Sequence, residues 1–200
     1  MSFRIPILNV RLYLSFWFFA LVVLALQLDR QILLWYMVLP IAVHETGHLV
    51  AIALCRVGVR EIRLTPVSIR IVTRRATHTY CRELIIAVAG IAANLLLALY
   101  LRLFVFQSLR TMLMIASNLA VAGFNLLPVG NLDGGKLTGL LFSRYLEPRA
   151  AQTASNLLSF IVLVPLSYLA GALLLRSGNF TLAVICVYLI AVSVAGTSGR

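Results

Sequence analysis

Long apolar runs alternate with short polar segments along the chain. A transmembrane helix needs about 20 apolar residues to cross the hydrocarbon core of a bilayer, and six runs reach or approach this length. The hydrophobic pattern therefore predicts an all-α polytopic membrane protein with about six transmembrane helices. The expected spans are residues 12–28, 32–54, 84–101, 113–127, 157–175 and 180–194.

The connection between the second and third expected spans has a different pattern. Residues 57–73 alternate apolar and polar side chains on either side of Thr65 and Pro66. Alternation with a period of two is typical of half-buried strands, and a proline between two such runs indicates a turn. The pattern predicts a short β-hairpin-like element. A basic surface loop that alternates by chance is the alternative.

The composition supports the membrane class. Hydrophobic residues make up 62% of the chain and charged residues 12%, and the mean hydropathy is +1.00, whereas soluble domains carry roughly 25% charged residues. Six acidic residues give too little charge for a disordered chain. Cys55, Cys81 and Cys186 are far apart in the sequence and predict neither a disulfide framework nor a thiolate zinc site.

The net charge of +11 comes from seventeen Lys and Arg residues that are spread through the gaps between apolar runs. A nucleic-acid-binding protein clusters such residues on one face, so we expect no nucleic-acid partner and interpret them as topology determinants. Positive residues in short loops stay cytoplasmic. With six spans, thirteen basic residues fall on one side and four on the other, which predicts both termini in the cytoplasm.

The second expected span contains the sequence His44-Glu45-Thr46-Gly47-His48. An ionisable residue inside a membrane span is costly and indicates a functional site. Residues four apart on a helix share a face, so both imidazoles can bind one metal ion, and Glu45 can reach a water molecule at that ion. The alternative is a pair of hydrogen-bonded core histidines.

A catalytic zinc site has three protein ligands and one open position for water, so a further ligand is needed. Asp133 stands at the predicted cytoplasmic end of the fourth span, on the side that the inner end of the second span also reaches. Asp29 is expected on the opposite side, and the other carboxylates and His78 lie among arginines. We therefore expect Asp133 to be the third ligand; a helix-terminal Asx-turn, which Asp-Gly-Gly favours, is the alternative.

Helix-breaking residues flank the expected site. Pro40 precedes His44 by four residues and is expected to bend the second span. Pro128, Gly130 and the pair Gly134-Gly135 are expected to open the end of the fourth span into irregular chain. Irregular backbone at membrane depth is tolerated where it lines a wet cavity, so we expect cytoplasmic water to reach the metal.

Two asparagines are candidates for polar roles within the membrane. Asn94 lies in the third span and must find a hydrogen-bond partner there. It either fastens the third helix to another or takes part in the active site. Asn94 and Asn125 are both candidates for donors that stabilise the substrate or the developing oxyanion.

The motifs HETGH in the second span, GIAAN in the third and NLLPVGNLDGG at the end of the fourth resemble those of the site-2 proteases, which are intramembrane zinc metalloproteases. Within that family, NLLP, LDGGKL and LLFSR are most similar to the stage IV sporulation protease FB branch. The resemblance covers about residues 39–144. The sequence departs from the family pattern at Ile91, where the family usually has proline, and at Asn131, where it often has proline. We also expect no C-terminal nucleotide-sensing domain, which some members of the family have.

The resemblance implies that His44, His48 and Asp133 bind one Zn²⁺ ion and that Glu45 is the general base of peptide-bond hydrolysis. It also implies a membrane-tethered protein substrate, such as the pro-form of a sigma factor, and membrane-bound inhibitor proteins. We expect one transmembrane protease domain over residues 1–200, with a metalloprotease core at about 32–140 and an active site near the cytoplasmic face.

Two other functions are compatible with polar residues in the membrane. A divalent-metal transporter also needs intramembrane histidine and carboxylate, but it needs polar residues along a path on both sides of the membrane, and the outer half of this chain has almost none. A catalytically silent membrane scaffold is the other alternative.

Overall fold

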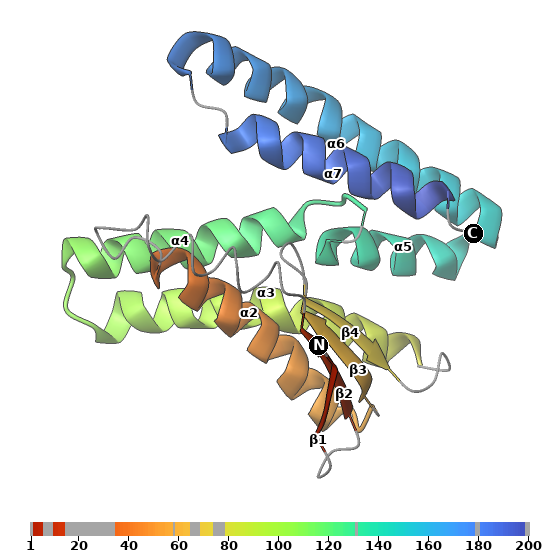
Figure 1. Cartoon of the computed structure of the whole chain (residues 1–200), viewed down its shortest axis with the longest axis horizontal. Helices are drawn as coiled ribbons and strands as arrows, with labels where there is room; N and C mark the ends of the chain where they lie inside the picture. The colour runs from red at the N-terminus through yellow and green to blue at the C-terminus, as the bar shows by residue number, and fades with distance from the viewer. Residues whose placement is uncertain are drawn as a thin grey trace. The chain divides into compact units, whose positions relative to one another are not determined.

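The computed structural model describes residues 2–5, 10–14, 35–57, 59–64, 69–73, 79–130, 132–178 and 181–198. The strands are β1 (Ser2–Ile5), β2 (Val10–Leu14), β3 (Val59–Leu64) and β4 (Ile69–Thr73). The helices are α2 (Trp35–Leu54), α3 (Tyr80–Phe104), α4 (Leu109–Leu126), α5 (Asp133–Tyr145), α6 (Pro148–Ser177) and α7 (Thr181–Ser198) (Figure 1). The chain forms two compact units, Met1–Ala122 and Gly123–Arg200, so that the boundary lies inside α4.

The first unit contains a four-stranded sheet in the order β1-β2-β3-β4. β1 and β2 pair antiparallel, β2 and β3 parallel, and β3 and β4 antiparallel. The first two strands were not expected: residues 12–14, which the hydrophobic pattern assigns to the first span, end β2. A four-stranded sheet therefore accompanies the helices, and its second strand uses the start of an apolar run that the pattern assigned to a helix. Residues 15–28 of that expected span lie outside the described residues.

Helices α2 and α3 pack against each other in the first unit (Figure 1). The exposed side of α3 carries large apolar residues such as Leu96, Leu99 and Leu103. Its buried residues are Ala87, Gly90, Ile91, Asn94 and Ala98. All of them except Ile91 are small or polar. This arrangement is the reverse of a soluble helix. It is typical of transmembrane helices, which approach one another through small residues and present leucines to lipid.

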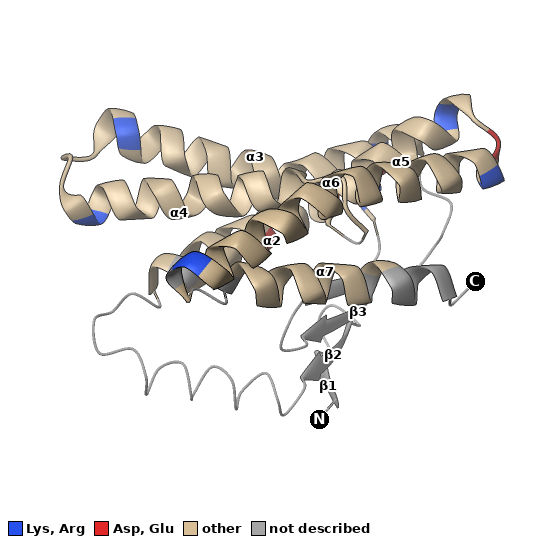
Figure 2. Ribbon diagram, turned by 90° about the horizontal axis from the view of Figure 1, so that it is seen from above, with Lys and Arg blue, Asp and Glu red and all other residues tan. Residues whose placement is uncertain are grey.

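Charged residues of α3, α4 and α6 lie near the helix ends, and the middle segments of these three helices are uncharged (Figure 2). Among the described residues, Tyr80–Phe104, Leu109–Leu126 and Pro148–Arg176 are long and apolar enough to cross a membrane. Shorter apolar helices cover Val38–Leu54 and Leu182–Ala191. The chain is a helical membrane protein by these criteria. The number of six spans and the orientation of the termini stay predictions.

The second unit contains α5, α6, α7 and the connection that follows α4. α5 packs against α6 and α6 against α7, with Val129, Leu163 and Leu189 in the core. Ser159 of α6 fastens the connection, because its hydroxyl lies 3.0 Å from the carbonyl oxygen of Pro128 and accepts the N–H of Gly130 at 3.4 Å.

The helical conformation breaks after α4, but Gly134 and Gly135 are not part of the break. They lie in the first turn of α5, a helix that the sequence did not predict. A Cβ atom at Gly134 would collide with the carbonyl of Leu126, and one at Gly135 with the carbonyl oxygen of Gly130. These glycines allow close backbone approach, which explains why two helix-breaking residues occur inside a helix.

Candidate metal centre

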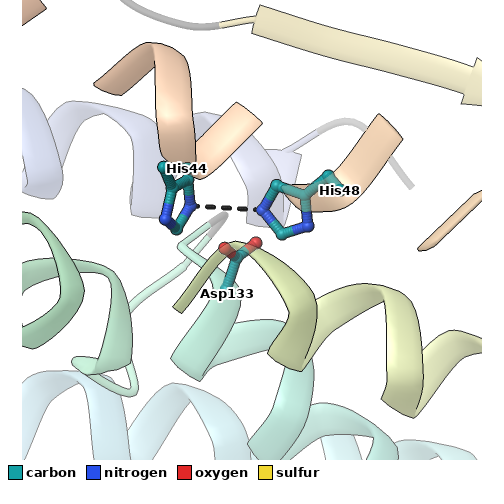
Figure 3. Close-up of side chains that lie close together, drawn as sticks. All are labelled: His44, His48 and Asp133. Carbon is teal, nitrogen blue, oxygen red and sulfur yellow. Dashed lines mark hydrogen bonds between the residues drawn. The ribbon is translucent and has the colours of Figure 1, made fainter. Parts of the chain in front are cut away.

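His44 and His48 lie one helical turn apart on α2, and their side chains are buried. The ring centroids are 4.8 Å apart and the ring planes are nearly perpendicular, at 84°. The two Nε2 atoms face each other at 3.2 Å (Figure 3). The four-residue spacing therefore places both imidazoles on one face of α2, with their Nε2 atoms close together.

The Nδ1 atoms of both histidines donate to oxygen atoms of α3. His48 Nδ1 donates to the carbonyl oxygen of Ile86 at 2.7 Å, and His44 Nδ1 donates to Oδ1 of Asn94 at 2.9 Å. The orientation of the Asn94 amide follows from its Nδ2 atom, which donates to the carbonyl oxygen of Pro40 and to Oδ1 of Asn118. Each imidazole thus carries a hydrogen on Nδ1, and in the neutral ring Nε2 holds a lone pair.

Two lone pairs 3.2 Å apart repel each other unless a cation is shared between them. A hydrogen bond between the two Nε2 atoms requires one additional proton, whereas a metal ion uses both nitrogens as ligands. For tetrahedral zinc with Zn–N distances of about 2.05 Å, two nitrogen ligands are about 3.3 Å apart. The separation of the histidine pair therefore fits a zinc ion.

Gly90 of α3 lies opposite the histidine pair. A Cβ atom at this position would be 2.5 Å from Nε2 of His48 and 2.8 Å from Nε2 of His44. Ile86, Gly90 and Asn94 follow one another at intervals of four residues and so share one face of α3. The same helix face provides the hydrogen-bond partners of both imidazoles and the space in front of their Nε2 atoms.

Substitution of Gly90 by alanine is expected to weaken zinc binding by about ten-fold or more, because the added methyl group displaces both imidazoles. The dissociation constant is measured on the purified protein in detergent, by competition with a fluorescent zinc indicator. Gly123→Ala and Gly171→Ala are matched controls, since a Cβ atom at either position meets no atom within 4 Å. Unchanged zinc affinity in Gly90→Ala would contradict the assignment of the metal position.

Asn94 and Asn118 are completely buried, with exposed fractions of 0%. Both amide hydrogens of Asn94 are donated, to Pro40 and to Asn118, and its oxygen accepts from His44. Asn94 thus fastens α3 to α2 and α4, and it has no amide hydrogen left for an oxyanion. Asn118 was not singled out from the sequence, although an asparagine in an apolar span is itself an indication of a polar contact.

Asp133 is the first residue of α5, in the second unit, and its exposed fraction is 3%. Its Oδ1 atom accepts a hydrogen bond from Lys136 Nζ at 2.8 Å. The Lys136 side chain is 57% exposed, so this ion pair adds little stability. His44, His48 and Asp133 are each buried, and each offers one atom that can bind a metal ion (Figure 3).

Glu45 and Asn125 are both partly exposed. Glu45 follows His44 on α2, and Asn125 lies in the last turn of α4, in the second unit. Their roles as general base and oxyanion donor stay predictions.

Comparisons with known proteins find a likeness among the solved structures. No protein-family model matches the chain, and no curated protein matches it in sequence. Among solved structures, the chain is similar to the Site-2 Protease from Methanocaldococcus jannaschii, with a TM-score of 0.68 and 18% sequence identity. The likeness covers 98% of this chain and 95% of that chain, and it shows a shared fold.

Proposed function

We propose that the protein is an intramembrane zinc metalloprotease in which His44, His48 and Asp133 bind one zinc ion and Glu45 is the general base. The observation that carries the proposal is the pair of Nε2 atoms 3.2 Å apart, with both Nδ1 atoms engaged as donors. Two Nε2 atoms at this separation have the spacing of two zinc ligands.

Three further observations support the proposal. Two imidazoles and one carboxylate are a ligand set that suits zinc and leaves one position open. The helices are apolar enough to lie in a membrane. The fold is that of a protein described as a site-2 protease. A buried histidine pair that serves packing alone accounts for none of these three observations.

The chemistry of the proposed reaction is peptide-bond hydrolysis. A zinc ion held by His44, His48 and Asp133 would supply Lewis acidity toward a peptide carbonyl and a water molecule. Glu45 takes up the proton that the water loses and gives it to the departing amide nitrogen, while the hydroxyl group is added to the carbonyl carbon. Asn125 is the proposed donor to the developing oxyanion, because the hydrogens of the Asn94 amide are already used.

The proposed substrate is a membrane-tethered protein. A peptide bond inside a helix is poorly accessible, because its carbonyl is already hydrogen-bonded, so the substrate must be unwound near the cleaved bond. β4 is at the end of the sheet order and has an edge on which an extended segment can pair. We propose that main-chain hydrogen bonds to this edge replace those that the substrate helix loses.

The motifs NLLP and LDGGKL support a finer proposal. We propose that the substrate is the precursor of a transcription regulator, of the sigma-factor kind, that is released during sporulation. Membrane-bound inhibitor proteins are the proposed regulators. The count of basic residues supports an active site near the cytoplasmic face, with both termini in the cytoplasm.

The test is zinc-dependent cleavage in reconstituted vesicles that contain the protein and tagged single-span membrane proteins. We expect cleavage fragments with zinc present, none after treatment with a zinc chelator, and fragments again after zinc is returned. The same vesicles, loaded with a zinc indicator, test the transporter alternative. Zinc flux without cleavage of any test protein would overturn the protease proposal in favour of transport.

A further inference from the structure

Asn118, Asn94 and His44 form one continuous chain of hydrogen bonds across three helices. Asn118 Nδ2 donates to the carbonyl oxygen of Met114 at 2.8 Å, and Asn118 Oδ1 accepts from Asn94 Nδ2 at 2.9 Å. Asn94 Oδ1 then accepts from His44 Nδ1 at 2.9 Å. α4, α3 and α2 each contribute one side chain to this chain of bonds.

The direction of every bond in the chain is fixed by backbone carbonyls. Met114 and Pro40 each present a carbonyl oxygen, which can only accept, so the amide nitrogens of Asn118 and Asn94 must face them. This orientation turns the oxygen of Asn94 toward His44. His44 then has to carry its hydrogen on Nδ1, which places a lone pair on Nε2, the atom that faces His48.

We propose that Asn94, oriented by Asn118, is the positioning residue that holds His44 in the tautomer and ring orientation needed for metal binding. The proposal rests on the metal site proposed above. Neither asparagine is among the proposed metal ligands. Partners of this kind determine which nitrogen of a metal-binding histidine is available, and their loss weakens metal affinity by about 10- to 100-fold.

Without Asn94, the other tautomer of His44 becomes favourable. An Nε2–H on His44 can donate to Nε2 of His48, which is 3.2 Å away and has its own hydrogen on Nδ1. That bond uses the two nitrogens that the metal needs. Asn94 therefore prevents a direct bond between the histidines by keeping the hydrogen of His44 on the opposite side of the ring.

The test compares Asn94→Ala with Asn94→Asp. Both variants lose the donors to Pro40 and Asn118, so both are expected to have lower thermal stability. Asn94→Asp keeps an oxygen that accepts from His44 Nδ1, so we expect its zinc affinity to stay close to that of the unmodified protein. Asn94→Ala is expected to bind zinc about 10- to 100-fold more weakly. A purely structural role would weaken zinc binding in both variants to a similar extent.

A second readout does not need zinc. The chain has three histidines, His44, His48 and His78, so ¹⁵N NMR of histidine-labelled protein can resolve which ring nitrogen carries hydrogen. We expect His44 to carry Nδ1–H in the unmodified protein and in Asn94→Asp, and to lose it in Asn94→Ala. Asn156→Ala on α6 is the matched asparagine control and is expected to change neither readout.

The outcomes separate this proposal from the proposed function. If Asn94→Ala retains Nδ1–H on His44, or binds zinc within about two-fold of the unmodified protein, the positioning role is overturned. If the unmodified protein binds no zinc, the proposed function fails, and the NMR readout alone decides whether Asn94 selects the tautomer.

Discussion

Glu45→Gln is expected to retain zinc at the level of the unmodified protein and to lower the cleavage rate by about 10²- to 10⁴-fold. A general base contributes a rate factor of this size. Glutamine has nearly the same shape as glutamate but cannot take up a proton, and Glu45 is not among the proposed ligands. Zinc content is measured by elemental analysis of the purified protein, and the rate by fragment formation in reconstituted vesicles.

Glu83→Gln is the matched control for this change, since Glu83 is, like Glu45, a partly exposed carboxylate, and it lies in the first turn of α3. It is expected to cleave at the rate of the unmodified protein. If Glu45→Gln cleaves at an undiminished rate, Glu45 is not the base, and another proton acceptor is required. If it loses zinc instead, Glu45 takes part in metal binding.

Asp133→Asn is expected to lower zinc affinity by about 100-fold or more and to abolish cleavage at low zinc concentration. Loss of a partner that only orients a ligand costs about 10- to 100-fold, and removal of a ligand charge is expected to cost more. The substitution keeps the volume of the side chain, so the first turn of α5 retains its packing. The dissociation constant is measured with the same competitive indicator as for Gly90→Ala.

Glu147→Gln serves as the control for Asp133, because Glu147 is an exposed carboxylate at the N-cap of α6. An unchanged zinc stoichiometry and dissociation constant in Asp133→Asn would show that the third ligand is another residue. Loss of zinc in the Asp133 variant together with normal binding in the Glu147 variant would support the proposed ligand set.

The histidine pair could be predicted from the sequence because it depends on local geometry alone. Four-residue spacing on a helix places His44 and His48 on one face whatever surrounds them. The partners of their Nδ1 atoms depend on the register between α2 and α3, which no local pattern reveals. Ile86 accepts the hydrogen bond from His48 with its backbone oxygen, so the type of its side chain does not indicate this hydrogen bond.

The start of α5 was missed for a related reason. Glycine lowers helix propensity, so Gly134 and Gly135 are typical of irregular chain. In the structure they lie in the first turn of a helix, at positions where the carbonyls of Leu126 and Gly130 leave no space for a Cβ atom, so that only glycine fits. A tertiary contact thus overrides the local preference. The strand β2 was missed because its residues 12–14 continue directly into an apolar run.

The two histidines are held by different kinds of partner, and this difference affects how the centre can evolve. The backbone oxygen of Ile86 is present whatever side chain occupies position 86, so mutation there leaves the acceptor for His48 in place. The acceptor for His44 is a side chain and can be exchanged by one mutation. Changes in the strength of metal binding among descendants of this protein are therefore expected to arise through position 94 far more readily than through position 86.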